Sequence, residues 1–254
     1  DLKASYKLLF KATSTDSTLP VHNKTIESDS FALTHGAATQ IAVVTEGSTA
    51  RAGQVFDNQP VVHILDSQGN LVDTGSDATR TITVTHNGGT GVTWVNNRNS
   101  AAAIAGVTTF ATDSTKAIGL NGPSATSGYT LTYTLSGIGA TATQTVMLDA
   151  GTPYKLSEFT APASSVATGS FLPTDPQVKV LDQWGNWVKT DNSSTATAAL
   201  VLPSADGSTV RTASAAKYAV NGVITFTGLK YSCGWVARAA CRAVVPAFGA
   251  PMRK

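Results

Sequence analysis

The sequence predicts an all-β protein made of tandem antiparallel β-sandwiches. Three observations predict it: an internal repeat at an offset of 116 residues, alternation of apolar and polar residues, and a composition poor in helix formers. Charged residues are 13% of the 254 residues, and only three Glu accompany thirteen Asp. Helix surfaces draw on Glu, Lys, Gln and Arg, whereas Thr and Val favour strands. The length suits about two domains.

The repeat is clearest in LDSQGNLV at 65–72 and LDQWGNWV at 181–188. The same offset aligns GVTTF at 106–110 with GVITF at 222–226 without a gap. A register held over about sixty residues marks a tandem array whose period is a whole domain.

Strands are predicted from residues that alternate between an apolar and a polar face. No segment shows a sustained helical period, and the apolar stretches are short and separated by turns. Ile82 and Val84 share a face opposite threonines, and Tyr129, Leu131, Tyr133 and Leu135 form the apolar side of a half-buried strand. In PVVHILD at 60–66, Val62 and Ile64 face one way and Val61, His63 and Leu65 the other.

The repeated turn has a physical explanation in its residue types. Gly69 and Gly185 tolerate a positive φ, and an Asn follows each of them. Asp66 and Asp182 stand where their carboxylates can accept backbone N–H groups of the turn. We therefore expect a hairpin turn in each repeat.

The two ends of the chain suggest where the domains divide. Residues 30–45 resemble residues 145–160, as if a closing strand ran directly into the next domain, and YKLLFKA at 6–12 resembles YTLTYTL at 129–135. The predicted organisation is a partial repeat of closing strands at 1–34, a domain at 35–150, and a domain at 151–254 whose closing strand is degenerate or missing.

The order of motifs resembles the tandem immunoglobulin-like repeats of bacterial surface proteins, of the invasin and intimin type. The pattern is Gly-x-x-Phe, then Pro-x-Val-x-Val/Ile-x-Asp-x-x-Gly-Asn-x-Val, Gly-Val-x-Thr-Phe and Gly-Tyr-x-Leu, over most of 35–232. The resemblance implies immunoglobulin-like sandwiches and an extracellular or cell-surface structural or adhesive role in a stalk, filament or layer. Its motifs are strand and turn positions, which specify a fold rather than an activity.

Several functional classes find no support in the sequence. The net charge of +2 and the scattered Lys and Arg do not predict a nucleic-acid partner. No apolar run of about 18 residues predicts a membrane span. The four His lack metal or catalytic spacing, and no nucleophile motif is present, so we predict no enzyme and no cofactor.

Calcium is the one cofactor with candidate ligands. Asp66, Asn70, Asp73 and Asp77 gather around one predicted hairpin, and calcium takes several oxygen ligands. In the second repeat Lys189 stands at the position of Asp73, which favours the alternative that these carboxylates bind backbone amides.

Two tryptophans flank the second turn and raise a binding hypothesis. Trp184 and Trp187 replace Gln68 and Leu71 of the first repeat. Indole rings near a loop could stack on a sugar, or on a neighbouring domain or subunit. A carbohydrate-binding module is therefore the alternative function, with a glycan as a possible partner.

The ends also suggest an assembly mechanism. Tyr6, Leu8 and Phe10 are predicted to line an extra strand that completes the sandwich of another copy by strand addition. The alternative is that adjacent repeats of a longer surface protein flank this segment.

The two cysteines, Cys233 and Cys241, would be about 26 Å apart on one strand, so a disulfide between them would require a hairpin.

Overall fold

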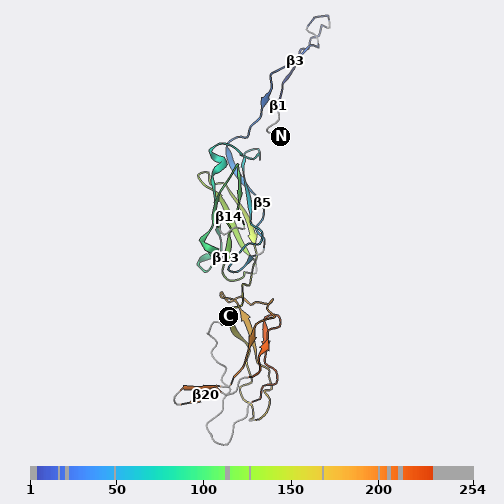
Figure 1. Ribbon diagram of the computed structural model, residues 1–254. Helices are drawn as coiled ribbons and strands as arrows, with labels where there is room; N and C mark the ends of the chain where they lie inside the picture. The colour runs from blue at the N-terminus through green and yellow to red at the C-terminus, as the bar shows by residue number, and fades with distance from the viewer. Residues whose placement is uncertain are drawn as a thin grey trace.

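In the computed structural model, the regular secondary structure of the described residues is almost entirely β-strand (Figure 1). Within the described residues, its helical elements are three short 3-10 turns, η1 (Ser76–Thr79), η2 (Gly89–Gly91) and η3 (Val95–Asn97). This architecture confirms the predicted all-β class. The structure describes residues 5–16, 18–20, 23–48, 50–111, 115–125, 127–167, 169–199, 201–204, 207–210 and 214–230.

A two-stranded N-terminal hairpin precedes the first sandwich and projects beyond its end (Figure 1). Strand β1 (Ser5–Tyr6) pairs with β4 (Phe31–Ala32), and β2 (Leu9–Lys11) pairs with β3 (Thr25–Glu27). None of the described residues of this hairpin is buried. It therefore has strand pairing without a core of its own.

The first unit is a sandwich of two antiparallel sheets, β11-β9-β14-β15 and β12-β8-β5, with the smaller sheets β10-β13-β7 and β16-β6 beside them. Its strands are β5 (Ala38–Thr45), β6 (Ala50–Arg51), β7 (Gln54–Val55), β8 (Val61–Asp66), β9 (Thr81–His86), β10 (Thr93–Trp94), β11 (Ser100–Ala102), β12 (Val107–Thr109), β13 (Gly119–Asn121), β14 (Tyr129–Leu135), β15 (Thr141–Val146) and β16 (Leu148–Asp149).

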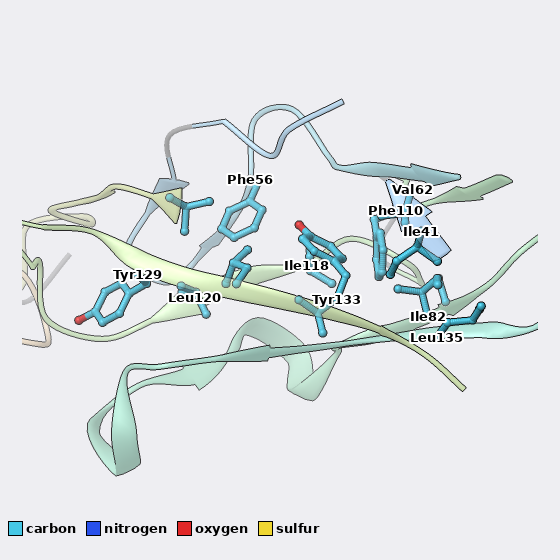
Figure 2. Packing of buried hydrophobic residues seen from close by; sticks show 14 of the residues in the cluster. Ile41, Phe56, Val62, Ile82, Phe110, Ile118, Leu120, Tyr129, Tyr133 and Leu135 are labelled. Atoms are coloured by element: carbon cyan, nitrogen blue, oxygen red, sulfur yellow. The ribbon is translucent and has the colours of Figure 1, made fainter. Parts of the chain in front are cut away.

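The core of the first unit lies between the two sheets (Figure 2). The apolar residues that alternate in β9 and β14 are buried, which confirms their predicted faces. In β8 the buried face is that of Val62 and Ile64. Phe110 and Tyr133 meet with ring centroids 6.2 Å apart. The Tyr133 hydroxyl donates to Oε1 of Gln144 at 2.7 Å, so its polar end is satisfied inside the core.

The second unit repeats part of this design around a smaller core that includes Val178, Val180 and Ile224. Its sheet β17-β18-β23 is accompanied by the pairs β19-β22 and β20-β21. The strands are β17 (Lys155–Thr160), β18 (Gln177–Leu181), β19 (Thr195–Ala196), β20 (Val201–Ser204), β21 (Gly207–Val210), β22 (Lys217–Tyr218) and β23 (Val223–Thr225).

Strand register repeats between the two units. Val107 pairs with His63 in the first unit, and Val223, 116 residues later, pairs with Lys179 in the second. The pairings β5-β8 and β17-β18 also correspond, and both have an irregularity at the same place, before Thr45 and before Thr160. The C-terminal segment with Cys233 and Cys241, where the closing strand of the second domain is predicted to be degenerate or missing, lies outside the described residues.

Candidate functional site: the turns at the domain junctions

The repeated Asp-x-x-Gly-Asn segments form the same tight turn in both units. The first turn (residues 66–70) follows β8, and the second turn (residues 182–186) follows β18. Gly69 and Gly185 have φ of 83° and 93°, a region that glycine adopts without strain. In each turn the Asp N–H donates to the Asn carbonyl at 2.9 Å, closing the hairpin.

The Asp carboxylate organises each turn from inside. Oδ1 of Asp66 accepts the backbone N–H groups of Gln68 and Asn70, each at 2.9 Å, which confirms the predicted bonds. Oδ1 of Asp182 accepts the corresponding N–H groups of the second turn at 2.9 and 2.8 Å. Both carboxylates are buried, so these bonds offset the cost of removing the charge from water.

The second carboxylate oxygen of each Asp accepts a backbone N–H of the linker that leads into that unit. Oδ2 of Asp66 accepts the N–H of Gly36, and Oδ2 of Asp182 accepts the N–H of Gly151, each at 2.8 Å. The side-chain amide of the turn Asn donates to the same oxygen. The Gly36 bond is the largest influence that lowers the pKa of Asp66 to about 2. The turn therefore positions the preceding linker as well as closing the hairpin.

The second turn also binds the first unit directly. Nδ2 of Asn186 donates to the carbonyl of Gly122 at 3.1 Å, and Oδ1 of Asn186 accepts the N–H of Ser124 at 2.7 Å. The Tyr129 hydroxyl, at the start of β14, donates to the carbonyl of Pro123 and positions this loop. One amide side chain thus satisfies two backbone groups of the neighbouring unit.

Trp184 is partly buried at this junction and packs against the core of the first unit. A Cβ at Gly53 would overlap with its indole ring, and a Cβ at Gly151 would overlap with the carbonyl oxygen of Ala52. The N–H of Ala52 donates to the carbonyl of Asp149 at 2.9 Å. Small residues on the first unit therefore make room for a large side chain from the second.

The linker at the first turn has additional polar contacts. Oδ2 of Asp77 accepts the N–H of Ala38 at 3.2 Å, and its Oδ1 accepts from Nε of Arg80 at 2.7 Å. The Arg80 contact is the main reason that the pKa of Asp77 is lowered. His35 is within hydrogen-bonding distance of Thr74 Oγ1, at 2.8 Å, and lies 3.7 Å from Asp73 Oδ1.

The four calcium candidates lie near one another but are engaged with protein groups. Asp66 accepts four N–H donors, and Asp77 accepts from Arg80. Among the described residues there is no group of three or more His, Cys, Asp or Glu side chains placed to hold a metal ion. Calcium binding at Asp66, Asn70, Asp73 and Asp77 stays a prediction, and the observed bonds correspond to its alternative.

The two tryptophans have different surroundings. Trp184 is in the junction, whereas the ring centroid of Trp187 lies 5.7 Å from that of Phe159, and the Lys179 ammonium lies 4.6 Å from the Trp187 ring centroid.

The turn and Trp184 were identified from the sequence, but Gly122 and Ser124 were not. The nearest signal was the replacement of Gln68 by Trp184, which marks the second turn as different.

The residues predicted for assembly are on the N-terminal hairpin. Leu8 and Phe10 are 52% and 55% exposed, and Tyr6 contacts Phe31 with ring centroids 6.2 Å apart.

No helix in the described part of the chain is long and apolar enough to cross a membrane.

Comparisons with known proteins find only distant structural similarities among the matches described here. No protein-family model and no curated protein matches the sequence. A solved structure of surface layer protein SbsC, domains 4-9, is 19% identical with a TM-score of 0.30, covering 88% of this chain and 31% of that one. Domains 5-6 of the S-layer protein SbsC are 20% identical with a TM-score of 0.28, covering 76% and 85%. Both scores lie below 0.5, and a function for this chain has to come from its own contacts.

Proposed function

We propose that this chain is a non-enzymatic structural module of a bacterial cell-surface stalk, filament or layer. The resemblance of its motifs to bacterial surface repeats supports the extracellular location. The observation that carries the structural role is the junction, where Asn186 and Trp184 of one unit bind the backbone and core of the other. Such contacts oppose the relative motion that is the default between domains.

Small-angle X-ray scattering of the full chain tests this role. The wild type should give an elongated particle with one well-defined maximum dimension. The double variant Trp184→Gln, Asn186→Ala should give a broader distribution of distances, because the second turn then lacks its contacts with the first unit. Gln68→Ala, which changes the exposed counterpart of Trp184 in the first turn, is the matched control. A wild-type curve as broad as that of the double variant would contradict the proposal.

The N-terminal hairpin supports a role as strand donor in assembly. Tyr6 pairs with Phe31 as Tyr129 pairs with Val146 in the first unit. There β9 pairs with the other edge of β14, and the opposite sheet covers the apolar face. In the hairpin the corresponding face, with Leu8 and Phe10, is exposed. Addition to the open edge of another sandwich would bury this face.

Hydrogen exchange at two protein concentrations tests strand donation. Amides of β1 and β2 should exchange quickly at low concentration and become protected at high concentration, while β14 stays protected at both. Unchanged exchange of β2 on association would exclude the hairpin from the contact.

Carbohydrate binding is the second candidate function, and an aromatic pair on the second unit favours it, in which Phe159 is exposed and Trp187 is half-buried. Phe159 is 46% exposed and lies beside Trp187, with the Lys179 ammonium 3.8 Å from the Phe159 ring centroid. Because Trp184 packs against the first unit, a sugar-stacking surface would have to use Phe159 and Trp187. A glycan array probed with wild type and Trp187→Ala decides the matter, since binding lost in the variant would support it.

A further inference from the structure

The sheet β17-β18-β23 of the second unit carries two aromatic rings and two lysines on the face turned away from its core. Lys179 stands in β18 between two buried valines, so its side chain lies on the opposite face of the sheet. Its ammonium is 3.8 Å from the Phe159 ring centroid and 4.6 Å from that of Trp187. The Lys189 ammonium is 5.0 Å from the Trp187 ring centroid. These four residues form one cluster, the lysine–aromatic patch.

The first unit has other side chains at the same positions of the same scaffold. The matching irregularities in β5 and β17, the matching pairs of β8 with β12 and of β18 with β23, and the matching bridges of the two turns establish the correspondence. The counterparts of Phe159, Lys179, Trp187 and Lys189 are Val44, His63, Leu71 and Asp73. Because both units keep the same register, the fold itself does not require aromatic rings or lysines here.

The lysine–aromatic patch is positively charged. Neither of its ammonium groups forms an ion pair with a carboxylate of the described residues. In β17 the residue opposite Lys179 is Ser157, whereas the acidic Glu158 stands opposite the buried Val178. A contact with an aromatic ring uses no acceptor oxygen, so the N–H donors of both ammonium groups can serve a ligand.

We propose that the lysine–aromatic patch binds an acidic saccharide, one whose sugar rings carry carboxylate or phosphate groups. The ammonium groups of Lys179 and Lys189 pair with the acidic groups, and the exposed Phe159 ring contacts the apolar face of a sugar. The cation–π contacts hold both ammonium groups near Trp187 before the ligand arrives, which reduces the side-chain entropy lost on binding. The inference rests on the carbohydrate-binding candidate above and adds the class of glycan.

Isothermal titration calorimetry of the full chain tests the inference with three probes: short oligomers of galacturonic acid, of galactose and of mannose 6-phosphate. The first two differ in a carboxylate against a neutral hydroxymethyl group, and the third supplies phosphate. The wild type should bind an acidic oligomer about tenfold more tightly than the galactose oligomer, and this preference should shrink as sodium chloride rises from about 50 to 500 mM. The tighter of the two acidic oligomers identifies the acidic group.

A matched pair of double variants locates the site. Lys179→Gln, Lys189→Gln should weaken binding of the acidic oligomer by about tenfold or more, because two charge-assisted contacts are lost. Lys217→Gln, Lys230→Gln removes the same charge elsewhere on the second unit, where Lys217 pairs with Ala196 and Lys230 lies near Phe171, and should leave binding unchanged. Thermal unfolding by circular dichroism verifies that both variants are folded.

The possible failures are distinguishable. Equal binding of acidic and neutral oligomers, lost in Trp187→Ala, would overturn the acidic class and leave the carbohydrate candidate intact. No binding of any oligomer at about 1 mM would overturn both and leave the structural role of the junction untouched. Polyglutamate that binds as tightly as the acidic oligomer would show recognition of charge without a sugar. Binding unchanged in Lys179→Gln, Lys189→Gln would exclude the patch.

Discussion

The closing hairpin of the first unit and the N-terminal hairpin have the same pairing and opposite environments. Tyr129 faces Val146 in one, and Tyr6 faces Phe31 in the other. Leu131 and Tyr133 are fully buried, whereas Leu8 and Phe10 are more than half exposed. An isolated two-stranded hairpin is at best marginally stable in water, so what separates the two is the sheet packed against the first. Burial, and not strand pairing, determines which hairpin contributes to the core.

The largest expected effect comes from truncating an aromatic side chain at corresponding positions of the two hairpins. Tyr133→Ala removes a buried ring and its hydrogen bond to Gln144, and should lower the free energy of unfolding by about 3 to 5 kcal/mol. Phe10→Ala should change it by less than about 0.5 kcal/mol in dilute, monomeric protein. Urea denaturation followed by circular dichroism measures both. Equal effects would mean that the N-terminal hairpin has a core of its own.

A second comparison uses the two linker glycines. Gly151→Ala should destabilise the chain by about 2 kcal/mol, because its Cβ would overlap with the Ala52 carbonyl. Gly36→Ala should have an effect within about 0.5 kcal/mol, since its Cβ would lie 3.6 Å from Asp66 Cβ, an ordinary contact. Urea denaturation of both variants gives the difference. A Gly151→Ala variant as stable as Gly36→Ala would show that the two linkers are equally open.

The third comparison concerns the two turn asparagines. Asn186→Ala should cost about 1 to 2 kcal/mol, because it leaves the Gly122 carbonyl and the Ser124 N–H without their partner. Asn70→Ala loses the bond to Asp66 and should cost less in the monomer. Hydrogen exchange of the Ser124 amide gives a local measurement, which should accelerate in Asn186→Ala and stay unchanged in Asn70→Ala.

The last prediction concerns the acid sensitivity of the first turn. The pKa of Asp66 is about 2 in the folded chain, below its ordinary value of 3.8. The ionised carboxylate therefore stabilises the fold above about pH 4, and this contribution is lost as the pH falls from about 4 to 2. The difference in melting temperature between wild type and Asp66→Asn should be largest at pH 5 and shrink toward pH 2. A constant difference over this range would contradict the role of the charge.

Much of the fold could be predicted because it depends on local patterns. Alternation in β9 and β14 indicates which side chains are buried, and the Asp-x-x-Gly-Asn pattern predicts a turn with a carboxylate bonded to backbone N–H groups. These features involve residues that are close together in the chain or that follow one period.

The junction could not be predicted in the same way. Asn70 and Asn186 are the same residue in the same local structure, and only the unit beside Asn186 gives it two partners. Gly122 and Ser124 act through backbone groups, which every residue except proline has in full, so no side-chain pattern marks them. Trp184 was recognised as unusual from its replacement of Gln68, but its burial against the first core depends on contacts more than a hundred residues away in sequence.

Residual dipolar couplings of the full chain test most directly whether the second turn holds the two units in one orientation. For the wild type, couplings from β8 and β14 of the first unit and from β18 of the second should fit one common alignment tensor. In the Trp184→Gln, Asn186→Ala variant the two units should require separate tensors of different magnitude. Separate tensors in the wild type would contradict the account, because the contacts of Asn186 and Trp184 would then fail to fix the junction.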